Sequence, residues 1–127
     1  MGDIIDDPKH DWLLEVLYNA NKTDTETYRV YQSISRYIFD ARDFIGIMDE
    51  IAPGIIRVKP LTDLADDCFF STVFFKEYLH RRSKYKGFPD VEFYIQAGRS
   101  AYSKTGFRSI SKNWYFWDNY INQHILL

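Results

Sequence analysis

The segment from Leu64 to Leu79 constrains the fold of this chain more than any other part of the sequence. Between residues 68 and 75 it reads Cys-Phe-Phe-Ser-Thr-Val-Phe-Phe, so almost no polar face remains at helical spacing. A helix that is apolar on all sides has to be enclosed by other elements. Thr62 is a candidate N-cap, and the basic residues 80–82 favour a helix end there. The sequence therefore predicts a central helix from about residue 63 to residue 82.

Two further helices are expected before this segment, because apolar residues recur there at intervals of three and four. The first runs from Pro8 to about Asn19, with Asp7 as its N-cap. The second starts with the capping-box sequence from Thr23 to Glu26. It keeps one apolar face to about residue 51, before a Pro-Gly pair that ends it. Residues 55–60 alternate in part, and they are expected to be a connection, extended or not, that packs on the helices.

Two more helices are expected after the central segment. Asp90 is a candidate N-cap for the fourth, in which Gly98 and Ala101 form a small-residue patch that another helix can approach. Gly106 suits the end of this helix. The fifth carries a narrow apolar seam at Phe107, Ile110, Trp114, Trp117, Ile121 and Ile125. The sequence thus predicts an all-α fold, a single compact bundle of about five helices with short loops, in one domain over residues 1–127.

The composition is typical of a globular chain inside the cell. Cys68 is the single cysteine and cannot form an internal disulfide, which fits a compartment where thiols stay reduced. Residues 1–7 are acidic and lack the basic and apolar regions of a signal peptide. No stretch approaches the ~20 apolar residues that a membrane span needs. We therefore expect a cytoplasmic protein that has no contact with membranes.

The sequence offers no group of residues at the spacing of a catalytic or metal site. Asp63, Asp66 and Asp67 could hold a hard cation or form an acid–base pair, but no histidine or glutamate completes a cage. Carboxylates in the first turns of a helix are favourable without any ligand, and this is the interpretation we prefer. Cys68 lies among apolar neighbours and is expected to be a buried, unreactive thiol. The histidines are isolated from one another at His10, His80 and His124. The sequence predicts no catalytic residue, no metal, no cofactor and no enzymatic activity.

The charge of the chain is distributed unevenly. Residues 1–63 hold twelve acidic and seven basic residues, a net charge of −5. Residues 76–112 hold three acidic and nine basic residues, a net charge of +6. Such an asymmetry indicates either a surface for an acidic partner or two halves of one domain that attract each other. The second interpretation is the more common one.

The strongest candidate for function is the basic segment 80–112, in which aromatic residues are interleaved. Cations beside aromatic rings are frequent in protein interfaces, and they also bind phosphates and unstacked bases. The candidate partner-binding residues are Arg81, Arg82, Lys84, Tyr85, Lys86, Arg99, Lys104, Arg108, Lys112 and Tyr115. A pI of 5.9 and the lack of a DNA-reading motif disfavour a dedicated nucleic-acid binder. We therefore predict a non-enzymatic protein–protein interaction module, such as a small helical adaptor, accessory subunit or regulator. The alternative is a nucleic-acid-associated protein that uses segment 80–112.

Three stretches in the middle of the chain carry a resemblance. The run Phe69–Phe75, the pair Arg81-Arg82 and the stretch Val91–Tyr102 together resemble small bacterial proteins that have no assigned role. The likeness covers about the middle third of the chain. It implies a bacterial, cytoplasmic origin, and it implies no functional residue because that group is uncharacterised.

Overall fold

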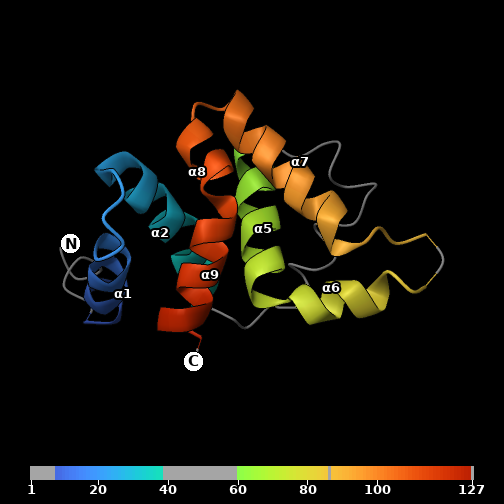
Figure 1. Cartoon of the computed structure of the whole chain (residues 1–127), viewed down its shortest axis with the longest axis horizontal. Helices are drawn as coiled ribbons and strands as arrows, with labels where there is room; N and C mark the ends of the chain where they lie inside the picture. Colours follow the sequence, from blue (N-terminus) through green and yellow to red (C-terminus); the bar gives the residue numbers. More distant parts are fainter. Residues whose placement is uncertain (1–7, 39–59, 86, 127) are drawn as a thin grey trace.

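The computed structural model describes residues 8–38, 60–85 and 87–126. These ranges form α-helices and contain no strand (Figure 1). The all-α fold expected from the sequence is confirmed, although the described ranges already hold seven helices and not the five expected for the whole chain. The helices are α1 (Pro8–Tyr18), α2 (Asp24–Ile38), α5 (Leu61–Phe74), α6 (Lys76–Arg82), α7 (Val91–Lys104), α8 (Arg108–Lys112) and α9 (Trp114–His124).

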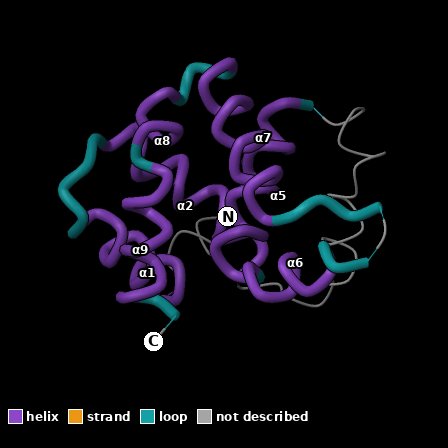
Figure 2. Tube along the Cα trace, turned by 45° about the vertical axis from the view of Figure 1, so that its right-hand side comes forward, coloured by secondary structure: helices purple, strands orange, loops and turns teal. Residues whose placement is uncertain are grey.

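Helix α5 is the centre of the fold, as its apolar sequence predicts. All of its residues from Leu64 to Val73 are buried. Helix α7 packs along α5, which also contacts α2 and α9 (Figures 1 and 2). The ring of Phe69 meets the ring of Trp114 edge-on, with 5.1 Å between the ring centroids. One hydrophobic cluster joins buried side chains from all seven helices.

The closest approach between these helices occurs at Gly98. A Cβ atom at this position would lie 2.4 Å from Cη2 of Trp114 and 2.9 Å from Cβ of Cys68. Real Cβ atoms do not come so close to a ring, because the repulsion is steep. The expectation that a small residue allows another helix to approach α7 is therefore confirmed at Gly98, where α5 and α9 both contact it.

The single central helix expected over residues 63–82 is wrong in two respects. Helix α5 begins at Leu61, directly after Pro60, so Thr62 lies inside the first turn and is not the N-cap. At Phe75 the backbone leaves the helical conformation, with φ at −129° and ψ at 33°. Helix α6 then turns sharply away from α5 (Figure 1). This change of direction places Leu79 in the core, where it is fully buried.

The expected fifth helix is also two helices. Its backbone departs from helical geometry at Asn113, which separates α8 from α9. The apolar seam survives this break, because its four central side chains are fully buried, and these are Ile110, Trp114, Trp117 and Ile121. The residues at the two ends of the seam, Phe107 and Ile125, are partly buried against the core. The seam is therefore confirmed, and the continuity of the helix is not.

The start of α2 differs from a complete capping box. Thr23 accepts a hydrogen bond from the backbone N–H of Glu26 at 3.3 Å, as expected. The carboxylate of Glu26, however, is buried and accepts hydrogen bonds from Trp117 Nε1 at 2.7 Å and Asn113 Nδ2 at 2.9 Å. Glu26 thus ties α2 to the start of α9. Asn21, with φ at 61°, ends the turn after α1 as its type predicts.

Several expectations fall outside the described residues. These are the N-cap at Asp7, the second helix beyond residue 38, the connection over 55–59 and the candidate residue Lys86. Within the described ranges, none of the helices has the length and apolar character required to cross a membrane.

Candidate functional site

The basic segment is divided by the structure into two groups. Arg81, Lys84 and Tyr85 lie at the end of α6 and in the loop after it, near the start of α7. Lys104, Arg108 and Lys112 follow from the far end of α7 onward, along α8. The 14 residues of α7 separate the two groups by about 20 Å, because an α-helix rises about 1.5 Å per residue. The candidates therefore do not form one continuous patch.

Arg82, one of these candidates, is used inside the protein. Its Nη2 atom donates a hydrogen bond to the Tyr94 hydroxyl at 2.9 Å. Its guanidinium carbon lies 4.9 Å from the ring centroid of Phe88, 5.8 Å from that of Tyr78 and 5.9 Å from that of Tyr94. Cations at such distances from aromatic rings are attracted by the ring quadrupole. Arg82 therefore holds the loop after α6 against α7, so its role here is structural.

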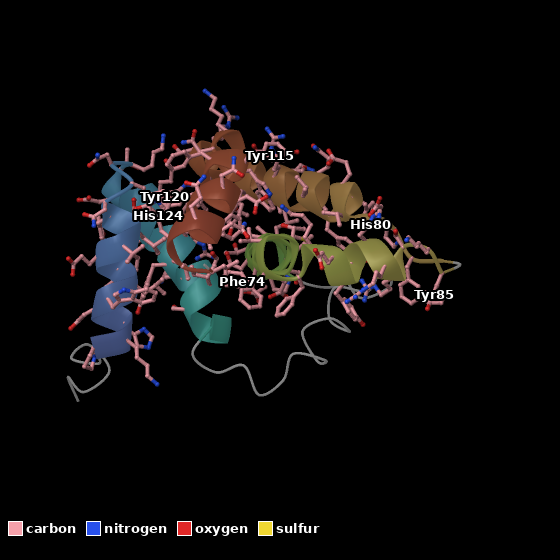
Figure 3. The ribbon with its side chains drawn as sticks, turned by 60° about the horizontal axis from the view of Figure 1, so that its bottom comes forward. Phe74, His80, Tyr85, Tyr115, Tyr120 and His124 are labelled. Carbon is pink, nitrogen blue, oxygen red and sulfur yellow. The ribbon has the colours of Figure 1, made fainter. Side chains whose placement is uncertain are left out.

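Arg99 and Tyr115 are a second internal pair. Arg99 Nε donates a hydrogen bond to the backbone carbonyl of Ser111 at 2.9 Å. Its guanidinium carbon lies 5.4 Å from the ring centroid of Tyr115. These contacts fasten α7 to the end of α8 and the start of α9. Figure 3 shows Tyr115 far from Tyr85, at a different part of the surface.

One of the remaining candidates beside α6, Arg81, lines a cleft next to that helix. This cleft has a volume of about 540 Å³ and lies between the α5–α6 junction and the chain end after α9. Its apolar lining includes Phe74, which points away from α7 in Figure 3, and Leu126, which is 42% exposed. Arg81 stands at its edge. We call the following set the α6 surface: Phe74, Phe75, Tyr78, Arg81, Lys84, Tyr85 and Leu126.

Some cations around α6 form ion pairs within the described part of the protein, and others do not. Lys76 Nζ lies 2.6 Å from the Asp118 carboxylate, and this pair links α6 to α9. Arg81 is exposed, and its guanidinium has no ion-pair partner among the residues that the structure describes. Lys84 is exposed in the same way. The α6 surface therefore presents cations that are available to a ligand beside apolar side chains.

A side-chain hydrogen bond between His80 and Asp90 lies at the start of α7, next to this surface. His80 Nδ1 lies 3.3 Å from Asp90 Oδ1, and the same oxygen accepts a hydrogen bond from the backbone N–H of Val91 at 2.7 Å. Asp90 is thus the N-cap that the sequence predicts. The Val91 N–H, and after it the His80 side chain, lower the pKa of Asp90 below its ordinary value. The negative carboxylate is consequently the stable form at neutral pH.

The interpretation of Asp63, Asp66 and Asp67 as favourable charges in the first turns of a helix is only partly correct. Only Asp63 lies in the first turn, whereas Asp66 and Asp67 are buried. Asp66 forms an ion pair with Arg29 and accepts a hydrogen bond from the Tyr102 hydroxyl at 2.8 Å. Burial, and then the nearby Asp66, raise the pKa of Tyr102 well above its usual range. Tyr102 therefore stays protonated and donates to the carboxylate.

This buried network lies beside a polar cleft between α2 and α5. The cleft has a volume of about 390 Å³, and Arg29, Asp63 and Asp66 are among the residues that line it. The Nε atom of Arg29 is buried and has no hydrogen-bond partner among the residues that the structure describes. Sequence reasoning missed this network because Arg29 and Asp66 are 37 residues apart, and no local pattern connects them.

The other residues considered for chemistry lie apart from one another. Cys68 is fully buried, as expected. His10 Nδ1 lies 2.5 Å from the Tyr31 hydroxyl, whereas His124 packs against Tyr120 with 4.2 Å between ring centroids. Figure 3 shows His80 distant from His124. Across the described ranges, no three histidine, cysteine or carboxylate side chains gather in a way that could hold a metal ion.

Comparisons with known proteins return no relative. No family model, no curated protein and no solved structure matches this chain. The functional interpretation therefore depends on the geometry of the residues themselves.

Proposed function

We propose that this protein is a non-enzymatic interaction module that binds another protein through the α6 surface. The observation that carries the proposal is the cleft of about 540 Å³, which is lined by apolar side chains such as Phe74 and Leu126 and by polar ones. Among the polar ones is Arg81, which has no ion-pair partner among the described residues. Protein-binding hot spots combine aromatic anchors with arginine and are found where apolar side chains can be desolvated. The α6 surface has this composition.

The distribution of exposed aromatic side chains also supports the α6 surface as the binding site. Tyr78, Tyr85, Phe88 and Phe93 are all exposed, and they lie within 16 residues of sequence around α6 and the start of α7. Tyr85 is the most exposed large apolar side chain of the described residues, at 69%. In soluble proteins, exposed apolar side chains mark an interaction site where they form a contiguous patch.

The arrangement of the basic residues favours a protein partner over nucleic acid. A nucleic-acid backbone is bound by cations that follow it over several phosphates. Here Arg82 and Arg99 make internal contacts, and the exposed cations form two groups at opposite ends of α7. Each group offers two or three exposed cations among the described residues. The nucleic-acid alternative remains as a competing outcome of the experiment below.

The test compares three tagged proteins as baits in an extract of the cells that produce this chain. They are the wild type, the α6 variant Arg81→Glu/Lys84→Glu and the matched control Lys104→Glu/Lys112→Glu. Both variants reverse two exposed charges, so a nonspecific electrostatic effect would be equal in the two. Arg82 is left unchanged, because its loss would release the loop after α6.

We expect the wild type and the control to retain the same protein partner, and the α6 variant to lose it. Retention of the partner by the α6 variant would contradict the proposal. The extract is also treated with nuclease, and the purified protein is titrated with an oligonucleotide at ~20 mM salt, where electrostatic binding is strongest. Capture that depends on nucleic acid, or salt-dependent oligonucleotide binding, would favour the alternative.

A further inference from the structure

The polar cleft between α2 and α5 holds side chains whose polar groups have no partner in the described part of the protein. Its lining includes the amide of Gln32, the hydroxyls of Ser35 and Thr62 and the carboxylate of Asp63. None of these four side chains has a hydrogen-bond or ion-pair partner among the described residues. Ser35 is only 9% exposed, and a buried hydroxyl without a hydrogen bond costs free energy. These groups are therefore available to a ligand in the cleft.

One negative charge in this lining is not balanced by a cation. The Asp66 carboxylate forms an ion pair with Arg29, which also packs over the ring of Phe107. Asp63 has no such partner among the described residues. The described lining thus contains one cation, Arg29, and two anions, Asp63 and Asp66, so its net charge is −1. A cleft lined by an excess of one sign of charge favours a ligand of the opposite sign.

Two tyrosine rings also line this cleft. The ring centroids of Tyr28 and Tyr31 are 5.5 Å apart, and Tyr28 is 48% exposed. The face of an aromatic ring attracts a cation within about 6 Å of its centroid. A positively charged ligand in the cleft can therefore interact with both a carboxylate and an aromatic ring.

The oxygen atoms of the cleft suit an ammonium group better than a metal ion. Ca²⁺ and Mg²⁺ take roughly six or more oxygen ligands, and here one of the two carboxylates is already held by a guanidinium. A primary ammonium donates three hydrogen bonds, and Ser35, Thr62 and Asp63 offer acceptor oxygens for them. The volume of about 390 Å³ lies within the usual range of small-molecule sites, roughly 300–1,000 Å³.

We propose that the cleft between α2 and α5 binds the primary ammonium group of a small organic molecule. Asp63 is its ionic partner, and the hydroxyls of Ser35 and Thr62 accept its hydrogen bonds. The ring of Tyr28 forms an aromatic wall of the site. This site goes beyond the proposed protein-binding role and shares no residue with the α6 surface.

Titration of the purified protein with butylamine tests the proposal, at constant pH and ionic strength. The uncharged probe 1-butanol has the same chain length, and butyltrimethylammonium has the charge without the hydrogen-bond donors. The amide NMR signals of residues 28–35 and 61–66 report binding at the cleft. We expect saturable changes with butylamine at millimolar concentrations, and an affinity at least about 5-fold lower for 1-butanol and at least about 3-fold lower for butyltrimethylammonium.

Three variants identify the groups that hold the ammonium. Asp63→Asn keeps the shape of the side chain and removes its charge, so it should weaken butylamine binding by at least about 5-fold. Ser35→Ala removes one acceptor and should weaken it by about 2- to 5-fold. The matched control Asp24→Asn changes an exposed first-turn carboxylate of α2 outside the cleft lining, and it should alter the affinity by less than about 2-fold. Melting temperatures close to that of the wild type verify that the variants are folded.

Equal affinities for butylamine and 1-butanol would overturn the proposal, because the ligand would then not be recognised by its charge. Unsaturable changes, or changes that are confined to other parts of the protein, would also overturn it. Equal effects of Asp63→Asn and Asp24→Asn would show only a general attraction of cations to the protein and would contradict the site. None of these results bears on the test of the α6 surface, because the two sites have no residue in common.

Discussion

The centre of α5 and the α6 surface contain the same kinds of side chain in opposite environments. Around α5, the rings of Phe69, Tyr102 and Trp114 are fully buried and meet one another. Around α6, Tyr78 and Tyr85 are exposed, although they follow in the same chain segment. The two regions are separated at Phe75, where the helix ends.

The comparison shows that one aromatic-rich segment has a buried part and a partly exposed part. Upstream of Phe75 its side chains are enclosed by α2, α7 and α9, so they contribute to the stability of the fold. Downstream of it, α6 contacts α5 and α7, and it buries Leu79 while Tyr78 and Arg81 are exposed. We therefore expect that substitutions only a few residues apart can change stability and the proposed binding separately.

The largest difference between the two regions is expected for Phe69→Ala against Phe74→Ala. Phe69 is fully buried, and truncating such a residue costs about 3–5 kcal/mol of unfolding free energy. Phe74 is partly buried at the edge of the cleft, so the same change there should cost about 1 kcal/mol. Urea denaturation of both variants measures this difference. Equal losses would mean that the cleft belongs to the core.

A second prediction concerns the close contact at Gly98. Gly98→Ala should destabilise the protein by about 1–3 kcal/mol, because its Cβ would meet the rigid ring of Trp114. In an open helix position the same substitution stabilises by up to about 1 kcal/mol. Ser100→Ala, at an exposed position of the same helix, is the control. A melting temperature for Gly98→Ala that equals or exceeds that of the wild type would argue against the tight packing of α5, α7 and α9.

A third prediction concerns the buried hydrogen bond from Tyr102 to Asp66. Tyr102→Phe should cost about 1–2 kcal/mol at pH 7, because it removes a donor to a buried carboxylate. The pKa of Tyr102 is raised on folding, so its contribution is complete below about pH 10 and is lost as pH rises through the folded-state pKa. Denaturation curves from pH 7 upward should therefore show the two proteins converging at alkaline pH. A constant difference would contradict the role of this hydroxyl.

The smallest effect on stability is expected at Asp90, which is exposed at the start of α7, next to the α6 surface. Its pKa is lowered on folding, so it stabilises the protein above the unfolded value of about 4 and ceases to do so as pH falls through the folded-state pKa. Asp90→Ala should reduce the melting temperature slightly at pH 7, and this difference should shrink as pH falls through the folded-state pKa of Asp90. Asp90→Asn keeps a capping side chain and serves as the control. If the difference in melting temperature between the wild type and Asp90→Ala grew toward acidic pH, the stabilisation by Asp90 would not come from its negative carboxylate.

The sequence predicts the helices well where local signals define them. The N-cap at Asp90, the turn at Asn21, the small residue at Gly98 and the seam through Trp114 and Trp117 all follow from residue type and spacing. These features depend on neighbours within a few positions. The corresponding structural elements are therefore confirmed with little change.

The features that the sequence does not predict depend on distant residues. Neither break, at Phe75 or at Asn113, is marked by proline or glycine, so each follows from packing against other helices. The partners of Arg82 come from three different segments, and Arg29 meets Asp66 across 37 positions. Counting basic residues along the chain could not separate those used internally from those exposed at the α6 surface.

Site-specific cross-linking tests the central claim about the α6 surface most directly. Because the single cysteine of the chain, Cys68, is fully buried, a Tyr78→Cys variant has one accessible thiol, which can carry a short photoreactive group. A Lys104→Cys variant places the same group at the far end of α7. With the partner captured by the wild type, we expect cross-links from position 78 and none from position 104. Cross-links from position 104 alone, or equal yields from both positions, would contradict binding through the α6 surface.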